Sequence, residues 1–188
     1  MDSKTVLLNY INDFGIIACN KDDIIQSIND IGSSWQDAVL LINEKEIFYS
    51  KIYKKKTVYI SKYLYSLLKK TWTQKKISEN ARLIYKILEN NPPQSTEMLR
   101  LVSGLKKEDF NKAQIELLEK LYITAASSYR SINENWSSFL YTTSIKWEQC
   151  TKIYYTNYTK EKAQKEIFIL LEKTMRKTDV EKILRNIL

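Results

Sequence analysis

Nine lysines lie between residues 51 and 76, together with four tyrosines and one tryptophan, and no acidic residue interrupts them. The whole chain has 30 Lys and Arg residues against 22 Asp and Glu; without these nine lysines the remaining 21 basic residues would give −1 instead of +8. A local concentration of one charge attracts polyanions such as nucleic acid or anionic lipid. The pattern predicts a phosphate-binding surface, with an ordinary solvated face as the alternative, made of Lys51, Lys54, Lys55, Lys56, Lys62, Lys69, Lys70, Lys75 and Lys76.

The side chains most often used in catalysis are scarce. The chain has no histidine, which removes Ser-His and Cys-His nucleophile pairs, imidazole bases and His-ligated zinc. Cys19 and Cys150 are too far apart in sequence for a Cys-x-x-Cys metal site, and we expect both to be buried thiols. Catalysis would have to rest on carboxylates, amides, lysines or tyrosines, and we predict no catalytic residue, no metal and no cofactor.

The composition predicts a folded, mainly helical protein. A chain of 188 residues with 44% apolar residues and only three glycines and two prolines favours long helices and short loops. Apolar runs stop at about five residues, whereas roughly 18 are needed to cross a bilayer. The N-terminal sequence MDSKTVLLNYINDF lacks the basic start and apolar block of a signal peptide. We therefore expect a cytoplasmic protein.

Apolar spacing and capping residues predict the same order of elements twice, without a sequence repeat. In the first half we expect three helices and then a hairpin, EIFYSKIY and TVYIS, whose turn carries Lys54, Lys55 and Lys56. Ser61 caps the helix that follows the hairpin. The three helices are expected from Lys4 to Phe14, ended by Gly15; from Asp22 to Asn29, capped by Asn20; and from a Ser33 and Gln36 capping box to Asn43.

In the second half, helices are expected to begin at Ser78, at Ser95 and near Lys107. The first ends before Pro92 and Pro93, the second at Gly104 and the third at Leu121. YITAASS and SSFLYTTSI predict a hairpin around the polar loop SYRSINEN, with Arg130 as the charge at its tip. Thr159 and Thr178 are the expected caps of two C-terminal helices.

Three helices followed by a hairpin is the order of a winged helix, a helix-turn-helix variant whose hairpin forms the wing. We therefore predict a mainly α fold with β-hairpins (α+β). It has a winged-helix unit at residues 1–76, a second at 77–150, and C-terminal helices at 151–188 that pack on the second unit. In this arrangement Lys54, Lys55 and Lys56 lie at a wing tip, where they can reach phosphates of any sequence and should dominate the salt dependence of binding.

The segments KKKTVYISKYLYSLLKK, ISENARLIYKILENNPPQSTEMLRLVSGLKKEDFNKAQIELLEKLYI and NWSSFLYTTSIKW resemble the AlkZ-related winged-helix proteins. These are similar to part of the AlkZ/YcaQ DNA glycosylases, and the resemblance spans roughly residues 35 to 175. It implies tandem winged helices and, for the glycosylases, excision of alkylated or crosslinked bases. The Gln-x-Gln or Gln-x-Asp motif that positions the attacking water in those enzymes is absent here. The resemblance therefore implies a DNA-binding protein of the DNA-repair type without glycosylase activity.

Other functions stay open at this point. A glycosylase would need a carboxylate or amide in a base-sized pocket, an aromatic ring for stacking and a basic cleft. Gln114-Ile115-Glu116 is the nearest imitation of the missing motif, and the tryptophans Trp35, Trp72, Trp136 and Trp147 could stack. The 13 tyrosines fit a protein–protein interaction module instead, because tyrosine is enriched at interfaces, and an oligomer is possible. Membrane-surface binding by residues 62–72 is the weakest option, since the segment lacks a broad apolar face.

One expected helix disagrees with the simplest mode of DNA binding. The outward positions of the helix that starts near Lys107 include Glu108, Asp109, Glu116 and Glu119, and a phosphate backbone would repel them. This acidic face could instead meet lysines of the same chain or a partner. We therefore assign the contact with duplex nucleic acid, expected to be DNA, to the basic hairpin and the helix after it.

Overall fold

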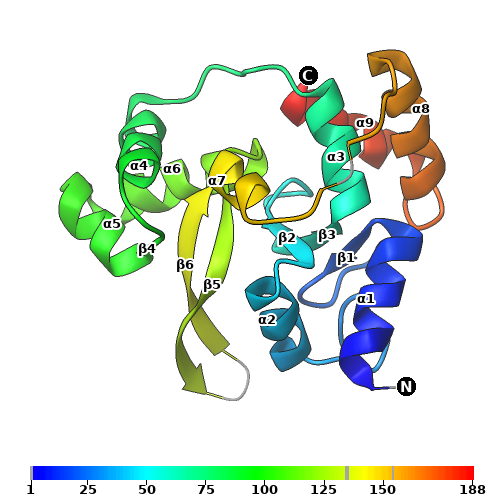
Figure 1. Cartoon of the computed structure of the whole chain (residues 1–188), viewed down its shortest axis with the longest axis horizontal. Coiled ribbons are helices and arrows are strands. Elements are labelled where there is room, and N and C mark those ends of the chain that lie inside the picture. The colour runs from blue at the N-terminus through cyan, green and yellow to red at the C-terminus, as the bar shows by residue number, and fades with distance from the viewer. Residues whose placement is uncertain (1, 134–135, 154) are drawn as a thin grey trace.

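The computed structural model describes residues 2–133, 136–153 and 155–188, which form a mixed α+β fold. Two small antiparallel sheets lie near the centre with helices around them (Figure 1). The helices are α1 (Ser3–Phe14), α2 (Trp35–Asn43), α3 (Lys62–Thr71), α4 (Glu79–Asn90), α5 (Thr96–Ser103), α6 (Lys107–Glu119), α7 (Ser144–Gln149), α8 (Lys160–Leu171) and α9 (Lys177–Ile187). The strands are β1 (Ile16–Ala18), β2 (Ile47–Ser50), β3 (Val58–Ser61), β4 (Gln94–Ser95), β5 (Ile123–Asn133) and β6 (Trp136–Thr143).

The two sheets have the same strand order. The first is β1-β3-β2 and the second is β4-β6-β5, so that the last strand in sequence lies in the middle of each. All the pairings are antiparallel. A helix precedes each sheet, and each sheet ends in a hairpin. The repeated order expected from the sequence is therefore present, with one missing element.

That element is the helix expected at residues 22–29, which does not form. The segment consists of turns and one parallel bridge to β1. Asp22 accepts a hydrogen bond from the N–H of Ile24 at 3.0 Å, and Asp30 accepts both the N–H and the hydroxyl of Ser27, at 2.8 and 2.7 Å. Carboxylate and hydroxyl side chains that bond nearby backbone groups favour turns over helix. These local bonds outweighed the apolar spacing that predicted a helix.

Most helix boundaries follow the predicted caps. The side chains of four expected N-cap residues accept a backbone N–H as predicted: Ser61, Ser78, Ser95 and Thr159. Helix α2 begins one residue later than expected, because its capping box is formed by Ser34 and Asp37. The last helix follows Arg176, which makes no side-chain cap, so Thr178 lies inside its first turn.

Helix α7 directly follows β6 and was not predicted. Thr143 caps it by accepting the N–H of Lys146 at 3.3 Å, and Trp147 is buried on its inner side. Cys150 lies at its C-terminal end and is exposed, whereas Cys19 is buried. The prediction of two buried thiols is therefore wrong for Cys150, because the chain leaves the core where α7 ends.

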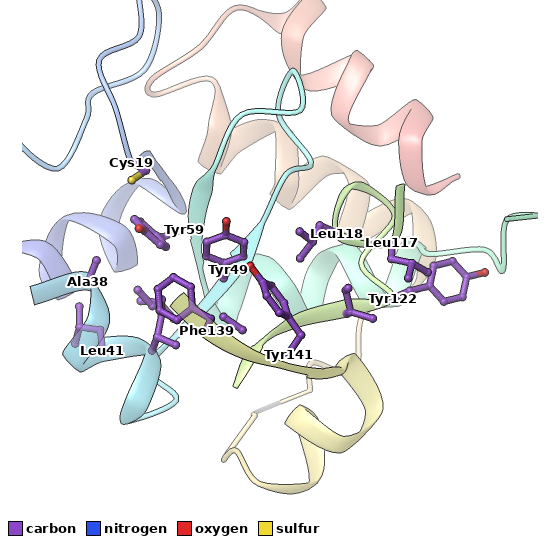
Figure 2. Close-up of a cluster of buried hydrophobic side chains, with 14 of the residues drawn as sticks. Cys19, Ala38, Leu41, Tyr49, Tyr59, Leu117, Leu118, Tyr122, Phe139 and Tyr141 are labelled. Atoms are coloured by element: carbon purple, nitrogen blue, oxygen red, sulfur yellow. The ribbon is translucent and has the colours of Figure 1, made fainter. Parts of the chain in front are cut away.

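The first sheet is buried on both faces. Its strands contribute alternate residues to two hydrophobic cores, Ile17, Tyr49 and Tyr59 to one and Ile16, Phe48 and Ile60 to the other. Continuous apolar sequences are typical of strands buried in this way. Figure 2 shows part of the first core, where Tyr49 and Tyr59 lie near Phe139 and Tyr141 of the second sheet.

The two sheets meet along the outer edge of β2. The Thr124 hydroxyl of β5 accepts the N–H of Tyr49 at 3.1 Å and donates to the carbonyl of Tyr49 at 2.9 Å. Ser50 of β2 donates its hydroxyl to the carbonyl of Leu118 at 3.0 Å. The outer edge of a sheet presents backbone groups that no strand pairs. Here side chains and backbone from the second half of the chain satisfy them, and the first core contains residues of both halves.

The C-terminal helices pack on the first half of the chain, whereas the sequence analysis placed them on the second. Helix α8 lies against α3 and α1, and α9 lies against α3 and α8 (Figure 1). The second core joins apolar residues of α3, α8 and α9 to the outer face of the first sheet. That face carries Ile16, Phe48 and Ile60, and it would be exposed to water if the C-terminal helices packed elsewhere.

Candidate nucleic-acid interface

The loop between β2 and β3, residues 51–57, carries the lysines predicted at a hairpin turn. Lys54, Lys55 and Lys56 are exposed there. Lys54 and Lys55 have φ angles of 49° and 58°, in the left-handed region that side chains other than glycine rarely adopt. The Lys54 ammonium lies 4.8 Å from the centroid of the ring of Tyr53, which is itself buried, so this contact holds the lysine side chain against the fold.

Lys56 is held by a carboxylate. It forms an ion pair with Asp22, whose side chain is only 1% exposed. Burial alone would raise the pKa of Asp22, but hydrogen bonds from Lys56 and from the N–H groups of Ile24 and Ile25 outweigh it and lower that pKa to about 2. Part of the charge expected to be free at the hairpin tip is therefore neutralised within the fold.

Several other lysines of the predicted surface also have internal partners. Lys62 pairs with Glu46 at 2.8 Å, and Lys69 pairs with Glu148 at 3.5 Å. Lys51 donates to the hydroxyl of Thr57 at 3.2 Å, and burial lowers the pKa of the Lys51 ammonium. Four of the nine are exposed and contact no carboxylate in the described part of the chain: Lys54, Lys55, Lys70 and Lys76.

A strongly cationic hollow lies beside the segment that links α3 to α4. We call it the linker groove; its volume is about 420 Å³. Four cationic side chains and one carboxylate line it, a net charge of +3. The lining residues are Gln74, Lys75, Lys76, Ile77, Arg82, Tyr85, Lys86, Glu89 and Tyr122. Two of the predicted lysines, Lys75 and Lys76, are thus placed together with cations of α4.

Arg82 and Lys86 were missed by the sequence analysis. Both are exposed on α4, and residues four apart lie on one side of a helix. Arg82 and Lys86 are four residues apart and follow Lys75 and Lys76 closely in the sequence, and this pattern could have identified them as further candidates. The groove also has aromatic walls, because Tyr85 and Tyr122 meet edge to face with ring centroids 5.5 Å apart.

The linker backbone is fixed from both sides. The Tyr122 hydroxyl donates to the carbonyl of Lys75 at 2.7 Å, and Lys120 donates to the carbonyl of Lys76 at 2.8 Å. From the C-terminal helix, the carbonyl of Ile187 accepts the N–H of Thr73 at 2.9 Å. The carbonyl of Arg185 accepts the Lys75 ammonium at 2.8 Å. Hydrogen bonds to other parts of the chain therefore hold the backbone that carries Lys75 and Lys76.

The hollows around the hairpin tip are less cationic. Lys54 and Lys55 line one of about 330 Å³ together with Lys182, but Glu119 and Asp179 line it as well. Lys54 also borders a second hollow, where Arg176 is balanced by Asp23 and Glu172. Their linings carry net charges of +1 and zero. Among these hollows the linker groove offers the strongest attraction for a polyanion.

Two other sequence predictions have definite positions. Arg130 is exposed within β5, opposite Ser138 of β6, rather than at the hairpin tip, because β5 continues to Asn133. The expected loop reached residues 134–135, which lie outside the described residues. Glu116, the carboxylate of the nearest motif imitation, pairs with Lys120 at 2.7 Å and accepts the Ser78 hydroxyl at 2.6 Å. This confirms that part of the acidic face of α6 meets a lysine of the same chain.

The described residues include no helix that is long and apolar enough to cross a membrane. They also bring together no group of three or more side chains suited to holding a metal ion. No curated protein and no solved structure gives a significant match to the chain. The family described as AlkZ related matches residues 7–188, nearly the whole sequence. The chain therefore belongs to the AlkZ-related family.

Proposed function

We propose that this protein binds duplex DNA through its phosphates, with two winged-helix units as the scaffold and the linker groove as the main contact. The observation that carries the proposal is the cluster of Lys75, Lys76, Arg82 and Lys86 around one groove of net charge +3. Membership of the AlkZ-related family supports DNA, and a role in DNA repair, over other polyanions. The repeated strand order, with a hairpin at the end of each sheet, supports the winged-helix assignment.

Binding in this groove follows from electrostatics and needs no base recognition. Each cation that neutralises a phosphate releases a condensed counterion, so affinity falls as salt rises. Arginine and lysine contacts to phosphate fix the position of a protein on the duplex but carry no sequence information. The exposed lysines of the hairpin tip, Lys54 and Lys55, add a second and weaker contact.

The proposal does not place α6 in the major groove. Glu108 and Asp109 are exposed in its first turn. Glu116 is occupied by Lys120 and Ser78. A helix with exposed carboxylates next to a phosphate backbone would be repelled. The lining of the linker groove contains one carboxylate, Glu89, against four cations, so the net attraction for phosphate remains.

The decisive experiment is titration of a fluorescently labelled duplex with the protein at several salt concentrations. If all four groove cations contact phosphates, the slope of log affinity against log salt should be about −3 to −4, or roughly a hundredfold loss between 50 and 200 mM salt. Arg82→Ala and Lys86→Ala should each reduce the slope by about 1. Lys165→Ala is the matched control, because Lys165 is an exposed lysine of α8, on the other side of the molecule from α4 (Figure 1).

A flat salt dependence, or equal losses for Lys165→Ala and Arg82→Ala, would contradict the proposal. Binding without bond cleavage is part of it, since Glu116 is engaged in holding Ser78 and Lys120. Duplexes with alkylated or crosslinked bases should therefore yield no abasic sites while still being bound. The appearance of abasic sites with the wild-type protein would replace this proposal by a glycosylase.

A further inference from the structure

Helix α9 contacts both the linker groove and the loop that carries the hairpin tip. The carbonyl of Arg185 accepts the Lys75 ammonium at 2.8 Å, and Figure 1 shows the end of α9 close to the start of the linker. The next residue, Asn186, donates its side-chain amide to the carbonyl of Ile52, just before the hairpin tip, at 3.3 Å. Consecutive residues of one helix therefore connect the two cationic surfaces, which are neighbours in the fold.

The exposed side of α9 has two cations of its own. Lys182 lines the hollow at the hairpin tip together with Lys54 and Lys55. Arg185 is exposed and forms no ion pair with any residue that the structure describes. Residues three apart lie on one side of a helix, so Lys182 and Arg185 extend from the same side of α9. Helix α9 thus adds positive charge between the two surfaces that it contacts.

The buried carboxylate of α9 is neutralised by more than one cation. Asp179 is 2% exposed, and its side-chain oxygens lie 3.3 Å from Arg176 Nε and 3.4 Å from the Lys182 ammonium. These three side chains together keep one positive charge. Glu119 also lines the hollow at the hairpin tip, and Glu181 is exposed on α9. These two carboxylates are the groups that oppose an approaching phosphate on this side of the helix.

We propose that α9 is a third phosphate contact, which joins the linker groove and the hairpin tip into one cationic band. The band consists of the cations of the linker groove, Lys182 and Arg185 of α9, and the hairpin lysines Lys54 and Lys55. The inference rests on the proposed function, because the partner is the same duplex. It assigns to that duplex a longer contact than the linker groove alone provides.

The spacing of phosphates in a duplex suits a continuous band. Each strand presents a phosphate about every 3.4 Å along the helix axis, so neighbouring phosphates can occupy adjoining cations at the same time. The cations of α9 then add their own counterion release to that of the linker groove. Because α9 is bonded to the linker through Lys75 and to the hairpin loop through Asn186, the three parts of the band are held together within the folded protein.

The test measures the salt slope of duplex binding for variants of α9. Arg185→Ala removes an exposed charge, while the carbonyl of residue 185 can still accept the Lys75 ammonium. This variant should reduce the slope by about 1. Lys177→Ala is the matched control and should leave the slope unchanged. Lys177 is also exposed on α9, but it lies about 12 Å before Arg185 along the helix axis and lines neither the linker groove nor the hollow at the hairpin tip.

Glu181→Gln tests the same surface with the opposite sign. Removing this exposed carboxylate takes away a repulsion between α9 and the bound phosphates, so affinity at low salt should rise about threefold. Glu97→Gln is the control, because Glu97 is exposed on α5, at the other end of the molecule from α9 (Figure 1). Its affinity should equal that of the wild-type protein. Thermal denaturation of each variant shows whether a loss comes from unfolding.

The outcomes separate this inference from the proposed function. If Arg82→Ala reduces the slope while Arg185→Ala behaves like Lys177→Ala, α9 is not a contact and the band is overturned, but the linker groove stands. An affinity of Glu181→Gln that does not exceed the wild-type value also overturns the band. A salt dependence that is flat for the wild-type protein overturns both proposals.

Discussion

The two sheets share a strand order but differ in their surroundings. The first is enclosed: each of its strand residues is buried, with one core on each face, and the C-terminal helices cover its outer side. The second is open at one end, because β5 becomes exposed at Tyr129 and Arg130. Its strands contain register shifts between Ala125 and Ser127 and again between Ser128 and Arg130. Such bulges twist a hairpin and redirect its side chains.

The difference shows that two sheets with the same strand order can have different roles in the molecule. Residues 1–76 contain 12 of the 25 lysines, more than residues 77–150 do, yet carboxylates such as Asp22, Glu46 and Glu148 hold several of them. Residues 77–150 contribute fewer cations, but Arg82 and Lys86 lie in a groove whose lining has one carboxylate. We infer that the first sheet mainly anchors the fold, and that α4 and the linker before it present the proposed binding surface.

The largest expected effect is a loss of stability when the contact between α8 and the first half of the chain is disturbed. A Cβ at Gly15 would lie 2.7 Å from Leu170 Cδ2 of α8, and Gly15 has a φ of +81°. Gly15→Ala should lower the free energy of unfolding by about 3 kcal/mol, from backbone strain plus overpacking. Gly104→Ala is the matched control in the second half, since its φ is +66° but no atom lies within 4 Å of the added Cβ.

Gly104→Ala should lower the free energy of unfolding by only about 1 kcal/mol, because the alanine strains the backbone there but its Cβ meets no neighbouring atom. Chemical denaturation of the two variants and the wild type measures both values. Equal costs at Gly15 and Gly104 would show that α8 is not packed against the first half as described.

The Asp22 and Lys56 pair should make the stability of the first half depend on pH. Folding lowers the pKa of Asp22 from 3.8 to about 2, so its contribution is complete above about pH 4 and is lost as pH falls toward 2. Asp22→Asn should therefore lower the free energy of unfolding by about 2 kcal/mol at pH 7. The difference between wild type and variant should vanish near pH 2.

Urea denaturation of both proteins across this pH range isolates Asp22 from other carboxylates with lowered pKa values, such as Asp37 and Asp179. A difference that stays constant down to pH 2 would mean that the carboxylate charge does not hold the hairpin loop.

The contact between the sheets should have a smaller but cooperative effect. Thr124→Val keeps the shape of the side chain but leaves the N–H and carbonyl of Tyr49 without their partner, at a cost of about 1.5 kcal/mol. Thr174→Val, which removes only a local bond to Leu171 at 3.2 Å, should cost about 0.5 kcal/mol. Calorimetry of Thr124→Val should still give one transition, because the first core includes residues of both halves. Two separate transitions would mean that the halves unfold independently.

The smallest effect is expected at the hairpin tip. Replacing Lys54 and Lys55 by alanine should reduce the salt slope of duplex binding by about 1 in total, whereas the double replacement of Arg82 and Lys86 should reduce it by about 2. The hairpin lysines share their hollows with Glu119, Asp179, Asp23 and Glu172, and this weakens their field. Fluorescence anisotropy at several salt concentrations compares the two variants. If the Lys54 and Lys55 variant lost more of the salt slope than the Arg82 and Lys86 variant, the hairpin tip and not the linker groove would be the main contact.

Local signals predicted much of the fold. Serines before apolar helical patterns, such as Ser61 and Ser78, marked helix starts because their hydroxyls satisfy otherwise free N–H groups. The lysines of the first hairpin were placed correctly in its loop. The turn at Asp22 was missed, because its carboxylate competes with helix formation in a way that apolar periodicity does not register.

Long-range features could not be predicted in the same way. Nothing local to Lys56 indicates that its partner is Asp22, 34 residues away. The packing of α8 on α3 rather than on the second half depends on which apolar face remains uncovered, which is a property of the assembled sheet. The linker groove also depends on chain segments that meet only in the folded protein.

The bonds from the linker to α9 have a consequence for how the protein is made. Thr73 and Lys75 find their carbonyl partners at Ile187 and Arg185, more than a hundred residues later in the chain. During synthesis the linker can therefore not take its final path until the last helix has left the ribosome. The linker groove would therefore reach its final form only after α9 has been synthesised.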